Sequence, residues 1–462
     1  MSEIRLLIFY RKYSFTRCHK TYYEDWLPEL LLRTEELNSL DLEDAGPEKI
    51  QRYFRGMDRL IKEHCEPIGF GVMIHTLGAI TILEMVLQRW LGDTKQIGSL
   101  LSGIPGNRTF EANLETWRLS REINASPQLK AIFTDHAASR IITLMHETEE
   151  GRVFLKRIEA FIEDYDFRGA EDREISFPRW GDDPTLLIDV LKFLVQADDE
   201  TTPETVEKRN MAKREAVTRD IMETLSLQRF GSIKKSMFKF LLKYARIYSL
   251  FRENQRYEID RVFYGERKAF VAAGKQLVRM GVLSDPDDIW FLSKEEVFDA
   301  LWNRMKPDEV RTVIVPRKAE YRRYTQVTPS MFIQGEREFD PLPEEKVESE
   351  RLETSLLTGV AASPGQATGK ARVMHSIREL TRIKPGDILV TNSTDPGWSS
   401  VFLLIKGLVL ETGGVLAHGT VLSREYGLPA VTSVLDATRI IKDGDTITVD
   451  GGMGSVSIAA GG

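Results

Sequence analysis

Cysteine is scarce in this sequence: Cys18 and Cys65 are the only two among 462 residues. Two thiols cannot build a disulfide framework, and they lack the paired spacing of a zinc site. Adjacent carboxylates such as Asp287 and Asp288 are typical of turns and helix caps rather than of a metal site. We therefore expect no metal bound by this chain, and a reducing compartment, the cytoplasm.

An excess of positive charge and a long apolar run are missing as well. Sixty-three Lys and Arg residues face 70 Asp and Glu, a net charge of −7, and the basic residues are dispersed, so nothing favours nucleic acid as a partner. Glu3 and Arg5 interrupt the N-terminal apolar residues, which excludes a signal peptide. The most apolar stretch, 68–88, contains His75 and Glu84, which favours a buried or substrate-facing helix over a membrane span. We therefore expect no membrane partner.

The first two thirds of the chain have the periodicity of helices. From about residue 22 to 305, apolar residues recur at three- and four-residue spacing. The clearest segments are 49–63, 152–165, 185–197 and 236–250. This pattern predicts a large, mainly α-helical domain over 1–335.

The chain then changes character. Prolines and charged residues between 336 and 355 predict an extended linker. Beyond it, at 356–462, short β-type runs are separated by glycine and predict a compact α/β domain. The expected strands are 369–375, 386–392, 406–411, 429–434 and a pair around 450–454. The expected fold class is therefore multidomain, α followed by α/β.

One segment of the second domain carries recognisable chemistry. A buried strand at 407–411 leads through a glycine turn into a helix at 417–426, which Gly427 ends. His418 lies in the first turn of that helix, where backbone N–H groups and the helix dipole favour a phosphoryl group on its imidazole. The alternative is that His418 only caps or packs this helix.

The stretch 412–431 resembles the phosphohistidine signature of the phosphoenolpyruvate-utilising enzymes, and 359–373 resembles the opening of their swivelling domain. The resemblance covers about 357–460. It implies a swivelling β/β/α domain that carries a phosphoryl group on His418. The residues expected to bind that group are Thr412, Gly413, Gly414 and Arg424.

The helical half resembles the acceptor-binding region of rifampin phosphotransferases and of two-component phenylphosphate synthases. The resemblance implies that Arg252 and Arg256, four residues apart on one helix face, clamp phosphate oxygens. Arg168 opens a second family segment and is expected to bind phosphate, with Asp172 or Glu174 as a general base for the acceptor hydroxyl. These five residues are predicted to converge on one acceptor site.

Purely structural interpretations of the same residues stay open. The two arginines of the helix could form a solvated or salt-bridged face. Related enzymes often have a histidine before the arginine of the second segment, where this chain has Phe167. One of three other histidines, His64, His75 or His146, could replace it, although packed or surface positions are typical of such residues.

The resemblance also implies partners. Related enzymes bind ATP in an ATP-grasp domain, and this sequence shows neither that pattern nor a Gly-x-x-x-x-Gly-Lys phosphate loop. ATP and Mg²⁺ are therefore expected on a separate ATP-grasp subunit, with a small organic hydroxyl compound as the acceptor. Two rival interpretations are a non-catalytic scaffold that keeps the fold and a pure phosphocarrier that docks a protein.

Overall fold

The computed structural model describes residues 11–94, 96–169, 173–197, 202–325, 356–414 and 417–459. The chain divides into two compact units, one made of 1–70 and 258–347 and the other of 71–257 and 348–462. Each unit is discontinuous in sequence because the 49-residue helix α13, Gly231–Arg279, contributes to both. The linker predicted at 336–355 lies outside the described residues, and the boundaries 1–335 and 356–462 stay a prediction.

The first unit is helical. Besides the end of α13 it contains α2 Cys18–Lys20, the π-helix η1 Thr21–Trp26, α3 Leu27–Asn38, α4 Pro47–His64, the π-helix η2 Cys65–Gly69, the 3-10 helix η3 Pro286–Phe291, α14 Lys294–Leu301 and α15 Pro307–Tyr324. The ring of Phe54 packs edge-on against Phe270 and Phe298. A capping box of Ser293 and Glu296 starts α14.

The second unit begins with helices. They are α5 Phe70–Leu91, α6 Ile97–Leu100, α7 Arg108–Ala125, α8 Pro127–Asp135, α9 Ala138–Glu147, α10 Glu149–Tyr165, α11 Thr185–Val195, α12 Pro203–Ser226 and the first half of α13. The predicted helical segments are confirmed. The Asn107 side chain caps α7 by accepting from the N–H groups of Thr109 and Phe110, and Thr202 caps α12 with Thr205.

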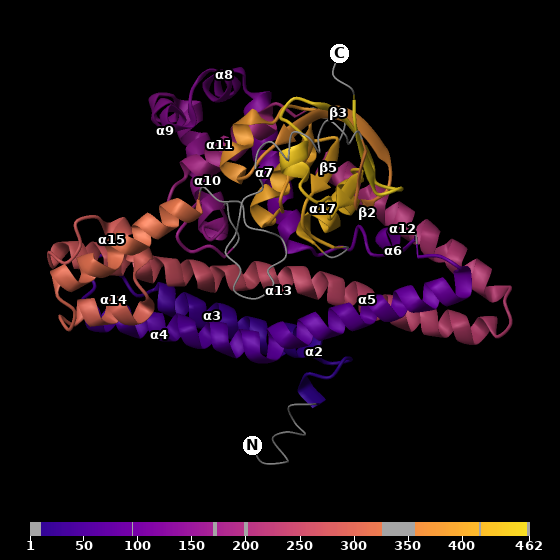
Figure 1. Ribbon diagram of the computed structural model, residues 1–462, viewed down its shortest axis with the longest axis horizontal. Helices are drawn as coiled ribbons and strands as arrows, with labels where there is room; N and C mark the ends of the chain where they lie inside the picture. The colour runs from indigo at the N-terminus through magenta and orange to yellow at the C-terminus, as the bar shows by residue number, and fades with distance from the viewer. Residues whose placement is uncertain are drawn as a thin grey trace. The chain divides into compact units, whose positions relative to one another are not determined.

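Helices α5 and α13 of this unit run antiparallel (Figure 1). Thr76 Oγ1 donates to the carbonyl of Tyr248, 3.2 Å away. Fourteen residues further along α5, the ring of Trp90 lies 5.6 Å from the ammonium of Lys234, which is fourteen residues earlier in α13. The buried face of α5 includes Thr76, so the helix has one packed side, as the predicted buried or substrate-facing helix requires.

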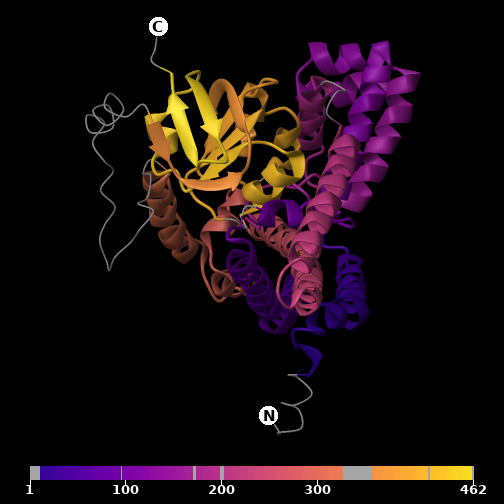
Figure 2. The ribbon, with the colours of Figure 1, turned by 90° about the vertical axis from the view of Figure 1, so that its right-hand side faces the viewer.

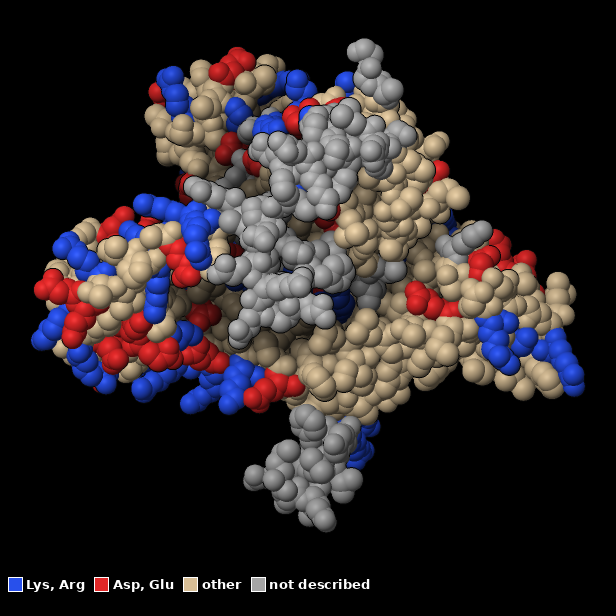
Figure 3. All heavy atoms as spheres, viewed as in Figure 1, with Lys and Arg blue, Asp and Glu red and all other residues tan. Residues whose placement is uncertain are grey.

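The opposite side of α5 is apolar and exposed. Met73, Ile74, Leu77 and Met85 are 50–64% exposed, and Figure 3 shows an area with few charged atoms over this helix. By length and composition alone, one helical run among the described residues, Pro47–Leu91, could cross a membrane, and 33% of its most apolar window is buried. Core helices of soluble proteins pass the same test.

The C-terminal part of the second unit is an eight-stranded sheet of order β1-β8-β7-β3-β4-β5-β6-β2. The strands are β1 Leu356–Thr358, β2 Val360–Ser363, β3 Gln366–Val373, β4 Ile388–Thr391, β5 Gly407–Leu410, β6 Ala430–Thr432, β7 Thr446–Asp450 and β8 Ser455–Ile458. Strands β3 to β6 pair in parallel and the others antiparallel. The predicted strands are confirmed, and β1 and β2 are additional.

Four short helices accompany the sheet: η4 Ile377–Arg382, η5 Pro396–Leu403, α17 His418–Tyr426 and α18 Ala437–Ile440. Figure 2 shows the strands on one side and the helices of 108–226 on the other, with η4, η5 and α17 between them. Apolar side chains bridge this junction, because Trp117 and Phe193 belong to one buried cluster with Trp398 and Phe402. The sheet domain is therefore docked on the helices of its own unit.

Candidate functional site

The polypeptide reaches His418 through a tight turn after β5. Gly413 has φ +130°, and a Cβ there would lie 2.9 Å from the Cβ of Ala417, so only glycine fits. Helix α17 then begins at His418 and ends at Gly427, which has φ +68°. His418 therefore lies at the N-terminal end of the helix, as the sequence pattern predicts.

His418 is buried between two polar side chains. Its exposed fraction is 5%. Its Nδ1 atom lies 3.8 Å from Oε2 of Glu253 on α13, and its Nε2 atom lies 3.5 Å from the hydroxyl of Ser399 on η5. A carboxylate beside Nδ1 favours the tautomer with the proton on Nδ1, which leaves the lone pair on Nε2. The atom that faces Ser399 is therefore the nucleophilic one.

Glu253 is anionic in this setting. Burial pushes the pKa of its carboxyl up, but His418, Arg252 and Arg256 together outweigh burial, so the pKa lies below its usual value. The second carboxylate oxygen, Oε1, lies 2.5 Å from Nη1 of Arg252. The carboxylate beside the imidazole is thus compensated by two arginines of its own helix.

A small cavity opens beside this group. It is lined by Thr76, Leu101, Ser249, Arg252, Glu253, Val421, Arg424 and Glu425. Val421 and Arg424 extend from the helix of His418, and Arg252 faces them from α13. Burial lowers the pKa of Arg424 to about 10, and Glu425 and Glu84 act in the opposite direction. Arg424 therefore stays charged at neutral pH, and the cavity contains two guanidinium groups.

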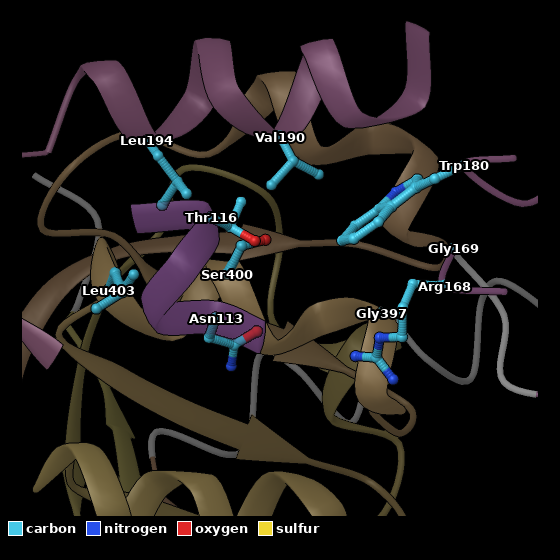
Figure 4. Close-up of a pocket in the computed structure, with 10 residues that line it drawn as sticks. All are labelled: Asn113, Thr116, Arg168, Gly169, Trp180, Val190, Leu194, Gly397, Ser400 and Leu403. Atoms are coloured by element: carbon cyan, nitrogen blue, oxygen red, sulfur yellow. The ribbon is translucent and has the colours of Figure 1, made fainter. Parts of the chain in front are cut away.

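A second small cavity is lined in part by η5. Figure 4 shows Arg168 and Trp180 pointing toward Ser400 of η5 and toward Asn113 and Thr116 of α7. The guanidinium of Arg168 also lies over the ring of Tyr257, one turn of α13 beyond Glu253, 5.4 Å from its centroid. Because Ser399 and Ser400 are neighbours, this second cavity borders the segment that contacts His418.

Comparison with known proteins assigns the part of the chain that holds His418. Residues 383–454 match the family described as PEP-utilising enzyme, mobile domain. This segment of the chain, which includes His418, is thus similar to the mobile domain of the PEP-utilising enzymes. Residues 69–253, a range that includes Arg252 and Glu253, match the family described as rifampicin phosphotransferase fourth domain.

Several curated proteins match most of this chain. It is 28% identical to a rifampicin phosphotransferase of Streptomyces sviceus over 90% of this chain and 47% of that protein. It is 28% identical to the uncharacterized phosphotransferase YvkC of Bacillus subtilis, over 77% and 42%, and 26% identical to the prodigiosin synthesizing transferase PigC of Serratia marcescens, over 93% and 48%. The chain thus spans about half the length of the curated relatives it matches.

The structure brings four of the predicted site residues together. His418 of the mobile domain, Arg252 and Arg256 of α13 and Arg424 of α17 all act on the same buried carboxylate, Glu253. The turn before α17 is held within the mobile domain: Thr412 Oγ1 donates to the carbonyl of Asn392 at 2.9 Å. Gly413 accepts from Ser433, and Gly414 accepts from the N–H of Ala417.

Two of the other three predicted residues are described by the structure, and both lie elsewhere. Arg168 lines the second cavity rather than the one with Arg252. Glu174 is exposed, and its carboxylate accepts from the N–H and hydroxyl of Ser176 in a local turn. Asp172 lies outside the described residues. The predicted convergence on one concave surface is therefore divided between two neighbouring cavities, and the base roles of Asp172 and Glu174 stay predictions.

The three histidines named as alternatives, His64, His75 and His146, lie in packed or surface positions. His64 is buried and accepts from the indole of Trp26 at 3.1 Å. His75 packs on the ring of Tyr248, and His146 is exposed. Among the described residues no group of three metal-binding side chains was found.

Sequence reasoning overlooked two residues of the site. Glu253 stands directly after Arg252, and a carboxylate inside a basic element was the available signal. Ser399 follows Asp395, whose side chain accepts from the N–H of Gly397 and starts η5. Nothing local in the sequence connects Ser399 with His418, because sheet pairing sets their distance.

Proposed function

We propose that this chain is a phosphotransferase component. In this proposal, His418 receives a phosphoryl group from ATP, bound with Mg²⁺ by a separate subunit, and passes it to a hydroxyl group of a small organic acceptor. The observation that carries the proposal is the position of His418 at the start of α17, with Glu253 at Nδ1 and two guanidinium groups lining the adjoining cavity.

The loading step forms one bond and breaks one. Nε2 of His418 attacks a phosphorus atom of ATP, a P–N bond forms, a P–O bond breaks, and the electron pair leaves on the nucleotide oxygen. The proton on Nδ1 stays in place. The N–H groups at the start of α17 and the hydroxyl of Ser399 suit the oxygens of the bound phosphoryl group.

The transfer step reverses the chemistry at the imidazole. The acceptor oxygen attacks phosphorus, the P–N bond breaks, and the pair returns to Nε2. With Nδ1 protonated and facing Glu253, the leaving group is a neutral imidazole. Arg252 and Arg424 neutralise the phosphoryl oxygens, which is the main requirement of a loose transition state. The hydroxyl proton is lost late, through the phosphate oxygens of the product to solvent.

An apolar acceptor suits the surroundings. Helix α5 lines the cavity through Thr76, and Leu101 and Val421 contribute apolar side chains to the same lining. The names of several relatives, rifampicin phosphotransferase and prodigiosin synthesizing transferase, refer to organic molecules. Rifampicin is accordingly the first acceptor to test.

The source of ATP is part of the proposal. Each of these relatives has about as many residues again with no counterpart in this sequence, which supports an ATP site outside the described residues. We propose the cytoplasm as the location.

The test uses the full chain with ATP labelled in the β or γ phosphate. Incubation with MgATP and an ATP-grasp subunit should give acid-labile label on His418, and His418→Ala should abolish it. Label on the chain alone would refute the separate subunit, and absence of label in both arms would refute the phosphohistidine. Label that never moves to a small molecule would favour the pure phosphocarrier.

A further inference from the structure

The helix that carries His418 has an incomplete C-terminal cap. The last carbonyls of an α-helix have no partner within the helix. In α17 the N–H of Leu428 donates to the carbonyl of Ser423 at 2.8 Å, and the N–H of Gly427 donates to that of Arg424 at 3.3 Å, which together form a Schellman motif. These two bonds do not use the carbonyls of Glu425 and Tyr426.

Those two carbonyls are occupied by consecutive residues of α12. The side-chain amide of Asn210 donates to the carbonyl of Glu425, and Nη2 of Arg209 donates to the carbonyl of Tyr426 at 2.9 Å. Arginine at a helix C-terminus is also favourable for the helix dipole. The helical region therefore completes the cap that the mobile domain leaves open.

The side chain of Glu425 makes the reciprocal contact. Its Oε2 atom accepts from the N–H of Gly103 at 2.7 Å, in the loop after α6. Buried Arg214 of α12 fixes that loop by donating to the carbonyls of Ser102 and Gly103. Donors and acceptors thus alternate across the contact, so that only the end of α17 in one orientation satisfies them.

The elements approach each other closely at glycines on both sides of the contact. A Cβ at Gly427 would lie 2.6 Å from Nη2 of Arg209, and a Cβ at Gly98 would lie 2.8 Å from Cδ of Arg424. A Cβ at Gly103 would lie 2.9 Å from the Cβ of Asn210. Such distances are below ordinary contact, so these three positions allow the elements to approach.

We propose that Arg209, Asn210 and the N–H of Gly103 form a docking receptor that recognises the C-terminal end of α17. Residues 418 and 426 are separated by about 12 Å along the helix axis. The receptor sets the axial position and rotation of α17 from its far end, and so places His418 beside Glu253 and Arg252. These are positioning residues, and their role in transfer rests on the proposed function.

The test measures how accessible His418 is, because it is buried only when docked. Diethyl pyrocarbonate acylates exposed neutral imidazoles, and exposed His375 of the same domain is an internal standard. Arg209→Ala and Asn210→Asp, which removes the donor with little change of shape, should raise the acylation rate of His418 at least tenfold relative to His375. Lys208→Ala, an exposed neighbour on α12, should not.

Circular dichroism and the melting temperature establish that each variant is folded. Equal His418 reactivity in wild type, Arg209→Ala and Asn210→Asp would overturn the receptor. The readout needs neither ATP nor an acceptor, so it is independent of the proposed function. If His418 never carries phosphate but its reactivity rises in these variants, the receptor stands and the phosphotransferase proposal fails.

Discussion

Around His418, the decisive residue is one that has no phosphate chemistry of its own. Glu253 is buried and holds its charge because His418, Arg252 and Arg256 compensate for the loss of water. A carboxylate near a transferring phosphoryl group repels it, so its benefit must come through the imidazole. It keeps the proton on Nδ1 and partners Arg252, whose guanidinium would otherwise be free to rotate.

Glu253→Gln tests this role with little change of volume. We expect transfer from phosphorylated His418 to an acceptor to slow by on the order of a hundredfold, because the imidazole loses its oriented tautomer. Loading from ATP should change little, since Glu253 belongs to the helical region and contacts His418 only in the docked position. Single-turnover transfer from protein phosphorylated in advance gives the rate.

Glu223→Gln, an exposed charge removal on α12, is the matched control. Equal slowing of loading and transfer in Glu253→Gln would contradict the assignment, since it would place Glu253 at His418 during loading as well.

At the level of elements, the loop after α6 and the end of α17 determine whether the mobile domain is docked. Gly103 combines two requirements: φ of +59° and close approach to α12. Gly92 has φ of +86° with open space around it. A comparison of substitutions at Gly103 and Gly92 therefore distinguishes the effect of backbone strain, which both share, from the effect of a steric clash, which only Gly103 has.

Gly103→Ala should undock the domain, whereas Gly92→Ala should not. Each substitution introduces a left-handed non-glycine residue, at roughly 1–3 kcal/mol, but only the first drives a methyl group against Asn210 and the backbone N of Met211. The expected result is a higher acylation rate of His418 in Gly103→Ala alone. Equal rates in the two variants would show that the close contact has no role in docking.

Docking should also depend on pH through Glu425. Burial raises the pKa of this carboxyl to about 7, against the opposing N–H of Gly103, the charges of Arg424 and Arg214, and Asn210. In the undocked domain the carboxyl is exposed to water, and we expect its pKa there to be about 4.3. The docked state therefore binds the proton more tightly, so docking is strongest below the undocked pKa and weakens as pH rises through 7.

The docked fraction can be followed by pulsed electron resonance between spin labels at exposed Leu227 and Met453. We expect the docked distance to lose population between pH 5 and 8, by up to about tenfold in the docking constant per pH unit. Glu425→Gln, neutral at every pH, should flatten the profile. A wild-type profile that rises with pH would have the wrong sign and would refute this explanation.

In the molecule as a whole, the docked mobile domain holds His418 in a buried position. An imidazole with 5% exposure, against α13 and η5, leaves no space for a nucleotide. The proposed loading by a separate ATP-binding subunit therefore requires that the mobile domain leave the helices on which its apolar face packs. The burial of His418 therefore implies two positions of the mobile domain in the proposed cycle, one for loading and one for transfer.

Hydrogen exchange should record the departure. With MgATP and the ATP-grasp subunit present, protection should fall together at 203–214 of α12 and at 418–427, which are the two sides of the docking contact. Exchange at 108–125, in α7, serves as the control for general loosening of the helices. Labelling of His418 with unchanged protection on both sides would show that it is loaded in place.

The sequence by itself determined the local features of this protein. Apolar periodicity gave the helices at 49–63, 152–165, 185–197 and 236–250 their correct positions, and alternation with glycine gave the strands. The position of His418 at the start of a helix followed from the turn and from Gly427, because caps and positive φ are properties of a few neighbouring residues.

Only the tertiary structure decided what surrounds His418. Glu253 is 165 residues away and Arg209 is 217 residues from its partner Tyr426, and no local pattern reports a contact between side chains so far apart. The same applies to Arg168 and Arg252, which the motif resemblance predicted at one site and which line two cavities. Periodicity and motifs act over a turn or a strand, whereas packing of the sheet on the helices sets which charges meet.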